Sequence, residues 1–202
     1  MTNAPRHINE ILQEIVTNES IINGRLGDLI DALHERGFGV LVFLFALPMA
    51  LPLPVPPGIN LLFALPLLLL TLQQSYGAKR PWLPKQLRQK NFNSEKMKSM
   101  LLKAEPWLDR LSILIRPRLG WMTQGTISKL IGVFGFLFAL CICIPIPLTN
   151  TVPSFAILLM AMGILMRDGL AVLAGMMIGS LWIMLLATLG VEGFKALISI
   201  IF

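Results

Sequence analysis

The chain has 202 residues, of which 55% are hydrophobic and only 14% charged, whereas soluble globular proteins carry about 25% charged residues. The formal net charge of +6 is uneven, because residues 1–37 carry a net −3, residues 74–129 a net +9 and residues 130–202 no net charge. This composition excludes an ordinary soluble fold and a soluble nucleic-acid-binding domain, and it predicts an all-α integral membrane protein with a single membrane domain over residues 1–202.

The first apolar stretch contains two arms joined by a cluster of prolines. The arms, residues 38–53 and 59–72, hold 16 and 14 residues, which is roughly 24 and 21 Å of helix, whereas a hydrocarbon core is about 30 Å thick. Proline lacks the backbone N–H and clashes with the preceding helical turn, so the cluster cannot lie inside one helix. We therefore predict a helical hairpin that enters the membrane and returns to the same side. Its turn contains the candidate residues Pro52, Pro54, Pro56, Pro57 and Asn60.

The same pattern returns after a shift of 93 residues. The motif GVxxFLFALxxxxPxP covers residues 39–54 and again residues 132–147, with 9 identities in 16 positions and no gap. Because two prolines and a glycine keep their register, we interpret the match as an internal repeat, with repeat one at about 25–73 and repeat two at about 118–166. Internal repeats of broken helices recur in transport proteins. The turn of the second hairpin contains Pro145, Pro147, Thr149, Asn150 and Pro153.

The segment between the repeats, residues 74–117, is basic and amphipathic. From Met97 to Ile115 its apolar residues recur at helical spacing, with lysines mainly on the opposite side. This pattern predicts an interfacial helix in the membrane plane, and it makes anionic lipid headgroups the expected partner of the basic residues in 74–129. Positive charge beside membrane segments marks the cytoplasmic side. We therefore expect the N-terminus and this segment to be cytoplasmic.

A C-terminal transmembrane helix is predicted over residues 169–190, because this apolar run is about 30 Å long as a helix. We expect the helix to end at residues 190–193, which contain two glycines. Gly175 and Gly179 are spaced to let another helix approach closely, either within the chain or in a homodimer. Since both hairpins return to the side they left, the two repeats should run parallel and the C-terminus should lie outside.

The sequence contains no constellation of residues typical of catalysis or metal binding. It has no paired carboxylates in an apolar arm, no nucleophile elbow, no phosphate-binding loop and no DxD-type motif, so we expect no enzyme activity, no cofactor and no metal. Polar candidates remain at the hairpin tips, and at the arm ends as Gln73, Arg167 and Asp168. The tip residues either cap helices where prolines free the backbone or line a polar path between two facing tips. Arg167 and Asp168 form either a helix boundary at the headgroups or a gating or binding site.

Seven motifs distributed along the chain carry a resemblance to a known family. They are LGDLIDAL (26–33), RGFG (36–39), LPLPVPPG (51–58), ALPLLLLTLQ (64–73), RPWLP (80–84), PIPLTNTVPS (145–154) and RDGL (167–170). Together they resemble the ExoD-type exopolysaccharide synthesis proteins of bacterial inner membranes. The resemblance implies a small multi-pass protein of the inner (cytoplasmic) membrane that is linked to exopolysaccharide production.

Two hypotheses for the function follow. In the first, the chain supports transport or translocation of exopolysaccharide or of its lipid-linked precursors through two facing hairpins. In the second, it is a scaffold that does not transport and that positions a polysaccharide synthase, so the polysaccharide synthesis machinery is its partner. A third possibility, an enzyme acting on a lipid-linked sugar, is disfavoured because the acid/base pair is missing. A wet path between the hairpin tips would favour the first hypothesis, and tips sealed by apolar packing the second.

Overall fold

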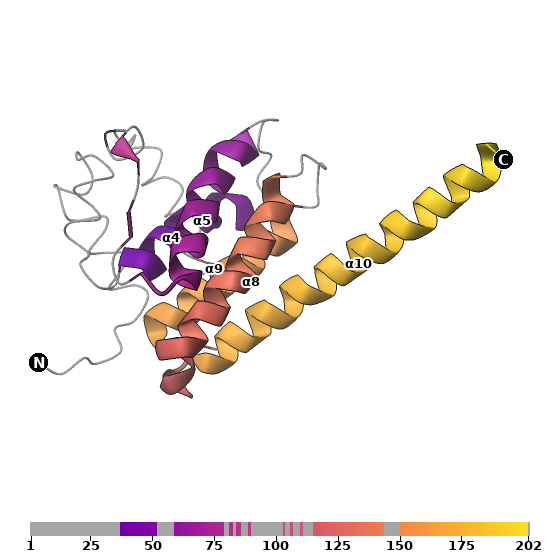
Figure 1. Cartoon of the computed structure of the whole chain (residues 1–202). Helices are drawn as coiled ribbons and strands as arrows, with labels where there is room; N and C mark the ends of the chain where they lie inside the picture. The colour runs from indigo at the N-terminus through magenta and orange to yellow at the C-terminus, as the bar shows by residue number, and fades with distance from the viewer. Residues whose placement is uncertain are drawn as a thin grey trace, which may run out of the picture.

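The computed structural model describes residues 37–51, 59–78, 115–143 and 150–201, together with a few single positions between residues 81 and 110. Over these residues the chain is all-helical, which confirms the predicted fold class at that level (Figure 1). The elements are α4 (Gly37–Ala50), α5 (Ile59–Ser75), the short 3-10 helix η2 (Gly120–Thr123), α8 (Gly125–Cys143), α9 (Thr151–Met166) and α10 (Gly169–Ile201).

Two of these helices end in the same type of turn. After α5, Gly77 adopts a left-handed φ of 78°, and the N–H of Ala78 donates to the carbonyl of Gln73 at 3.0 Å. After α9, Arg167 is left-handed with a φ of 55°, and the N–H of Asp168 donates at 2.8 Å to a carbonyl five residues back. This arrangement is the Schellman motif, which satisfies carbonyls that a helix end leaves free.

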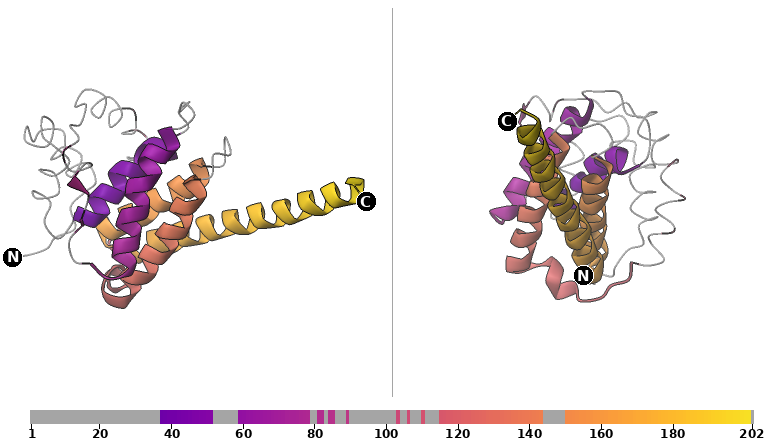
Figure 2. Two further views of the ribbon diagram at one scale, coloured as in Figure 1. Left: turned by 45° about the horizontal axis from the view of Figure 1, so that its top comes forward. Right: turned by 90° about the vertical axis from the view of Figure 1, so that its right-hand side faces the viewer.

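The closest packing joins helices that are far apart in the sequence. α4 packs on α9 and α5 packs on α8, while the chain neighbours α4–α5 and α8–α9 also touch (Figures 1 and 2). Gly39, near the start of α4, lies against Leu165 near the end of α9. Gly132 of α8 lies against Ser75 at the end of α5, and a Cβ on Gly132 would collide with the Ser75 backbone. Both pairs therefore run antiparallel, and the second requires a glycine at the crossing.

The last helix, α10, is much longer than the others and leaves the bundle. Its first turns pack on α9 and α8, where Gly175 lies against Ala156 and Met160, and Gly179 against the ring of Phe138. Beyond this contact, α10 extends away from the other helices (Figures 1 and 2).

The expectation that the C-terminal helix ends at residues 190–193 is wrong, because α10 continues to Ile201 as a helix of 33 residues. Glycine in a helix interior costs only about 1 kcal/mol relative to alanine. The sequence around Gly190 and Gly193 contains no proline, so nothing there blocks the backbone hydrogen bonds of the helix.

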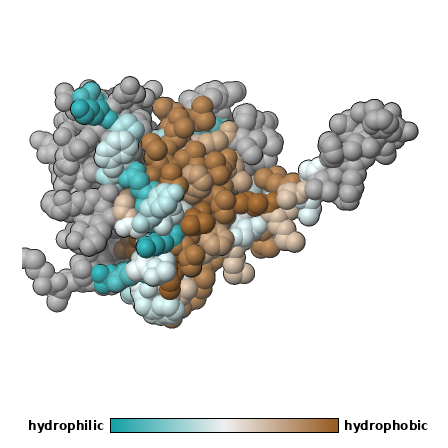
Figure 3. Space-filling view, in the orientation of Figure 1, coloured by the Kyte–Doolittle hydropathy of each residue, from teal (hydrophilic) through white to brown (hydrophobic). Residues whose placement is uncertain are grey.

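The core between the helices is apolar. Its largest fully buried side chains are Phe43, Phe138, Leu41, Leu47, Leu67, Leu70, Ile131 and Ile142. α4 and α9 supply most of the other buried residues, whereas α5, α8 and α10 also carry exposed leucines such as Leu62, Leu137 and Leu181. Figure 3 shows this hydrophobic surface over α5 and α8.

Extended apolar surface of this kind marks contact with a membrane or another protein. Two helical stretches, Gly125–Cys143 and Gly169–Gly190, are long and apolar enough to cross a membrane, and three shorter apolar helices accompany them. The described residues therefore point to membrane association.

Candidate functional site

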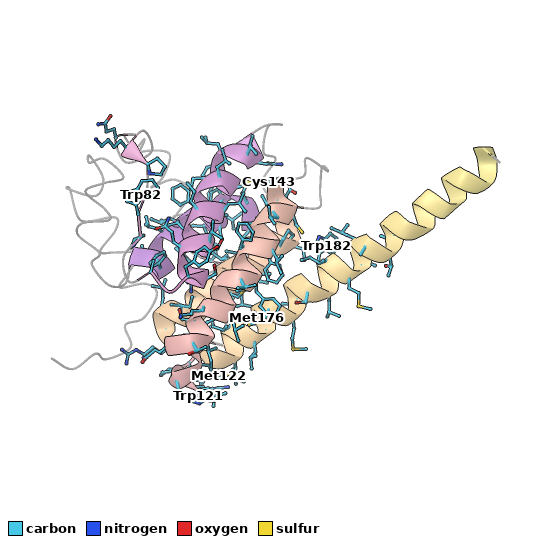
Figure 4. The ribbon with its side chains drawn as sticks, in the orientation of Figure 1. Trp82, Trp121, Met122, Cys143, Met176 and Trp182 are labelled. Atoms are coloured by element: carbon cyan, nitrogen blue, oxygen red, sulfur yellow. The ribbon has the colours of Figure 1, made fainter. Side chains whose placement is uncertain are left out.

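The helix ends divide the bundle into two ends with different chemistry. At the open end, α5 and α9 finish while α8 and α10 begin, and this end includes residues 73–78, 115–129 and 166–171. At the tip end, α4 and α8 finish while α5 and α9 begin. Figure 4 shows the two ends of α8, with Cys143 at the tip end and Trp121 and Met122 at the open end.

Most of the predicted tip residues lie outside the described part of the chain, namely Pro52, Pro54, Pro56, Pro57, Pro145, Pro147 and Thr149. Of the others, Asn60 is partly exposed in the first turn of α5, and Pro153 is buried in the first turn of α9. Asn150, immediately before α9, is only 6% exposed.

Asn150 is unusual because its side chain does not cap the helix that follows it. Its backbone carbonyl accepts from the N–H of Ser154 at 3.1 Å and from the Ser154 hydroxyl at 2.7 Å. Within the described part of the chain, the side chain makes no capping hydrogen bond and its buried Oδ1 has no partner. The capping interpretation is therefore wrong for Asn150. Leaving a buried acceptor unpaired costs about 1–3 kcal/mol, so this amide calls for water or a ligand.

At the open end, Arg167 and Asp168 form the boundary between α9 and α10. Asp168 is 2% exposed, and its Oδ1 accepts from the N–H of Leu170 at 2.9 Å and of Ala171 at 3.4 Å. Its other oxygen, Oδ2, accepts from the backbone N–H of Arg116 at 2.9 Å. The carboxylate thus caps α10 and ties the segment before α8 to the same corner.

Gln73 is also committed to backbone partners. Its Nε2 donates to the carbonyls of Leu69 at 3.0 Å and Trp82 at 2.7 Å. Its Oε1 accepts from the N–H of Trp82 at 2.6 Å. The side chain therefore fixes the chain after α5, where Trp82 is 65% exposed.

The predicted packing glycines act within the chain, since Gly175 faces α9 and Gly179 faces α8. Among the described residues, no group of three His, Cys, Asp or Glu side chains could hold a metal ion.

The sequence reasoning missed several residues that hold the helices together. Gln74 is 7% exposed, and its Nε2 donates to the Ser128 hydroxyl at 3.4 Å. A Cβ on Gly135 would lie 2.8 Å from the methyl of Thr71. A signal for the glycine contacts was available, because Gly132 is one of the residues that the repeat preserves.

These features define a class of protein: an all-helical chain with two helices of membrane-spanning length and polar side chains gathered at the helix ends. Comparison with known protein families identifies one family within this class. The family model described as "Exopolysaccharide synthesis, ExoD" matches residues 8–188, so the chain belongs to the ExoD family.

Two relatives illustrate the match. The chain is 32% identical over 175 residues to Protein ExoD of Rhizobium meliloti (strain 1021), covering 85% of this chain and 72% of that protein. It is also 32% identical over 152 residues to an uncharacterized protein of Synechocystis sp., covering 75% of this chain and 71% of the relative. No solved structure matches the chain.

Proposed function

We propose that this protein is a multi-pass protein of the bacterial inner membrane that supports exopolysaccharide synthesis or export through the polar tip end of its bundle. Membership of the ExoD family supports the link to exopolysaccharide. The role of the tip end is supported by the buried Oδ1 of Asn150, which has no hydrogen-bond partner among the described residues. An amide oxygen is an acceptor that a sugar hydroxyl or a water molecule can satisfy.

In this proposal α4 with α5 forms the first of the repeated hairpins, and α8 with α9 forms the second. In the repeat, α4 is equivalent to α8 and α5 is equivalent to α9, with an offset of 93 residues. The contact between α4 and α9 is therefore equivalent to the contact between α8 and α5, and both contacts are observed. Gly39 and Gly132, which are equivalent in the repeat, both lie at these crossings. The pattern is that of a two-fold pseudo-symmetry with both hairpins parallel, so both tips lie at one end of the bundle.

The orientation follows from charge. The net +9 of residues 74–129 supports a cytoplasmic open end, because positively charged loops stay on that side. The tip end then lies deeper in the membrane or at its outer surface, where the path of a polysaccharide has to cross.

No catalytic step is part of the proposal. Asp168 is the one acidic side chain that the structure describes, and its two oxygens accept three backbone hydrogen bonds. A carboxylate committed in this way is a poor general base. We propose a protein that binds or guides carbohydrate without a cofactor.

The test measures water access at the tip end by cysteine labelling in intact cells. Single cysteines are introduced at Asn60 and Asn150 in a chain whose two free cysteines, Cys141 and Cys143, have been replaced. We expect both positions to react with a small water-soluble thiol reagent. A cysteine at Leu70, which is 0% exposed, serves as the unreactive control. If neither tip position reacts while an exposed position such as Lys129 does, the tip end is dry and the transport role is wrong.

One observation favours the scaffold as the second candidate. Phe43, Phe138 and Leu70 fill the space between the helices and are at most 1% exposed, so the described bundle interior offers no polar route. A scaffold requires only the outer surface. It would leave the tip cysteines unreactive and would co-purify with a polysaccharide synthase from gently solubilised membranes.

A further inference from the structure

We propose that the connector, residues 116–124, is a preformed docking surface for anionic phospholipid headgroups. The inference rests on the membrane placement proposed above and names a particular site at the open end. It concerns the segment that joins the basic region to α8 and includes η2.

The first support is charge. Arg116 and Arg118 are exposed in the connector, Lys129 is exposed one turn into α8, and Arg167 is half-buried beside Gly120. The one described acid near them, Asp168, is buried and points its oxygens at backbone N–H groups. The exposed surface of this corner is therefore cationic, and guanidinium groups bind phosphate oxygens through two parallel hydrogen bonds.

The second support is the apolar side chains placed between these cations. Leu119 is 44% exposed and Trp121 is 65% exposed, and Figure 4 shows Trp121 at the outer end of the bundle, beside Met122. Water disfavours exposed apolar groups of this size, and an aqueous anion would leave them uncovered. The headgroup region of a membrane suits both the cationic and the apolar side chains of the connector, because tryptophan concentrates there and arginine finds phosphate at the same depth.

The third support is the fixed shape of the connector. Leu119 has a left-handed φ of 53°, which is strained for a residue with a branched apolar side chain. The N–H of Met122 donates to the Leu119 carbonyl at 2.9 Å, and the N–H of Gly169 donates to the Arg118 carbonyl at 2.7 Å. A Cβ on Gly169 would lie 2.8 Å from the Leu119 carbonyl oxygen. The strained geometry is thus imposed by the α9–α10 corner before any lipid binds.

The fourth support is position. The two stretches that are long and apolar enough to cross a membrane, Gly125–Cys143 and Gly169–Gly190, both begin beside the connector. Segments that adjoin the starts of two such helices lie where hydrocarbon gives way to headgroups. The connector is therefore placed at the depth that its arginines and its tryptophan require.

The experiment uses Trp121 as the reporter in the full chain, reconstituted into bilayers. Trp82, Trp107 and Trp182 are replaced by phenylalanine, so that Trp121 is the only tryptophan. Quenching of its fluorescence by brominated phosphatidylglycerol is then compared with quenching by brominated phosphatidylcholine at equal mole fraction. We expect stronger quenching by the anionic lipid. The variant R116Q/R118Q should lose this preference by about fivefold for each arginine removed, whereas Lys195→Gln, which removes a cation outside residues 74–129, should retain it.

A measurement on the unaltered connector guards against misfolded variants. Raising the salt to about 0.5 M should weaken the preference for phosphatidylglycerol, because surface charges are then screened within a few ångströms. Millimolar inorganic phosphate should leave the preference in place if the ligand is a membrane headgroup. Equal quenching by both lipids would overturn the docking proposal and leave the membrane placement standing. Quenching by neither lipid would overturn the membrane placement as well.

Discussion

At the open end of the bundle the buried side chains of Gln74 and Asp168 and the half-buried side chain of Gln73 have hydrogen-bond partners, whereas at the tip end the buried amide oxygen of Asn150 has none among the residues that the structure describes. Gln73, Gln74 and Asp168 bond to Trp82, to Ser128 and to three backbone N–H groups, respectively. Paired polar groups hold the helices in place, and an unpaired one remains available to a ligand. The comparison assigns a structural role to the polar side chains of the open end and a functional role to Asn150 at the tip end. Each prediction below tests one of these two roles.

The largest effect is expected at Gly132, where α5 and α8 cross. The variant Gly132→Val places its side chain against the backbone of Gln74 and Ser75, which cannot move without separating the helices. Overpacking of this kind destabilises by about 3 kcal/mol or more. Thermal unfolding of the purified protein in detergent measures the change.

The matched control is Gly190→Ala in α10, where a Cβ would meet nothing within 4 Å. It should unfold at the wild-type temperature or slightly above, since alanine stabilises a helix by about 0.5–1 kcal/mol relative to glycine. Wild-type stability of Gly132→Val would mean that the open end is loosely packed, which contradicts the comparison.

A second prediction concerns Asp168. Replacement by alanine removes the cap of α10 and the bond to Arg116, and it should lower the free energy of unfolding by about 2–3 kcal/mol. Asp168→Asn retains one acceptor oxygen and should lose about 1 kcal/mol. Thermal unfolding separates the two variants. Equal and full stability of both would show that this corner does not hold the connector.

Part of this architecture could be predicted from the sequence, because proline and hydropathy act locally. The predicted arm 59–72 corresponds to α5 (Ile59–Ser75), and the predicted start of the last helix corresponds to Gly169. The all-α class and the ExoD resemblance are confirmed. The re-entrant path of the hairpins and the membrane role of the repeat stay predictions.

The roles of the polar side chains could not be predicted, because they depend on where distant segments meet. Gln73 was a candidate for its position at an arm end, but its partner Trp82 is set by the turn through Gly77. Asn150 was a candidate, but its burial is decided by tertiary packing. The extension of α10 past Gly190 was missed for another reason, since one glycine is too weak a signal to end a helix.

A smaller effect is expected at Gln73. The variant Gln73→Leu loses both bonds to the Trp82 backbone, so stability should fall by about 1–2 kcal/mol and the Trp82 indole should move more freely. Fluorescence anisotropy of Trp82, as the sole tryptophan, measures that motion. Gln73→Glu still accepts from the Trp82 N–H and should be intermediate. An anisotropy that does not change in either variant would remove Gln73 from the structural side of the comparison.

The smallest change in stability, and the one that decides the comparison, is expected at Asn150. Asn150→Leu removes a buried amide whose oxygen has no partner in the described part of the chain, so the folded protein should be as stable as the wild type or more stable by about 1 kcal/mol. Gln74→Leu removes a buried amide that is paired with Ser128 and should destabilise. Exopolysaccharide output should follow the opposite order, with a larger loss for Asn150→Leu than its stability explains. If Asn150→Leu keeps full output, the tip end carries no function that depends on this amide, and the outer surface of the bundle becomes the place to look for a partner.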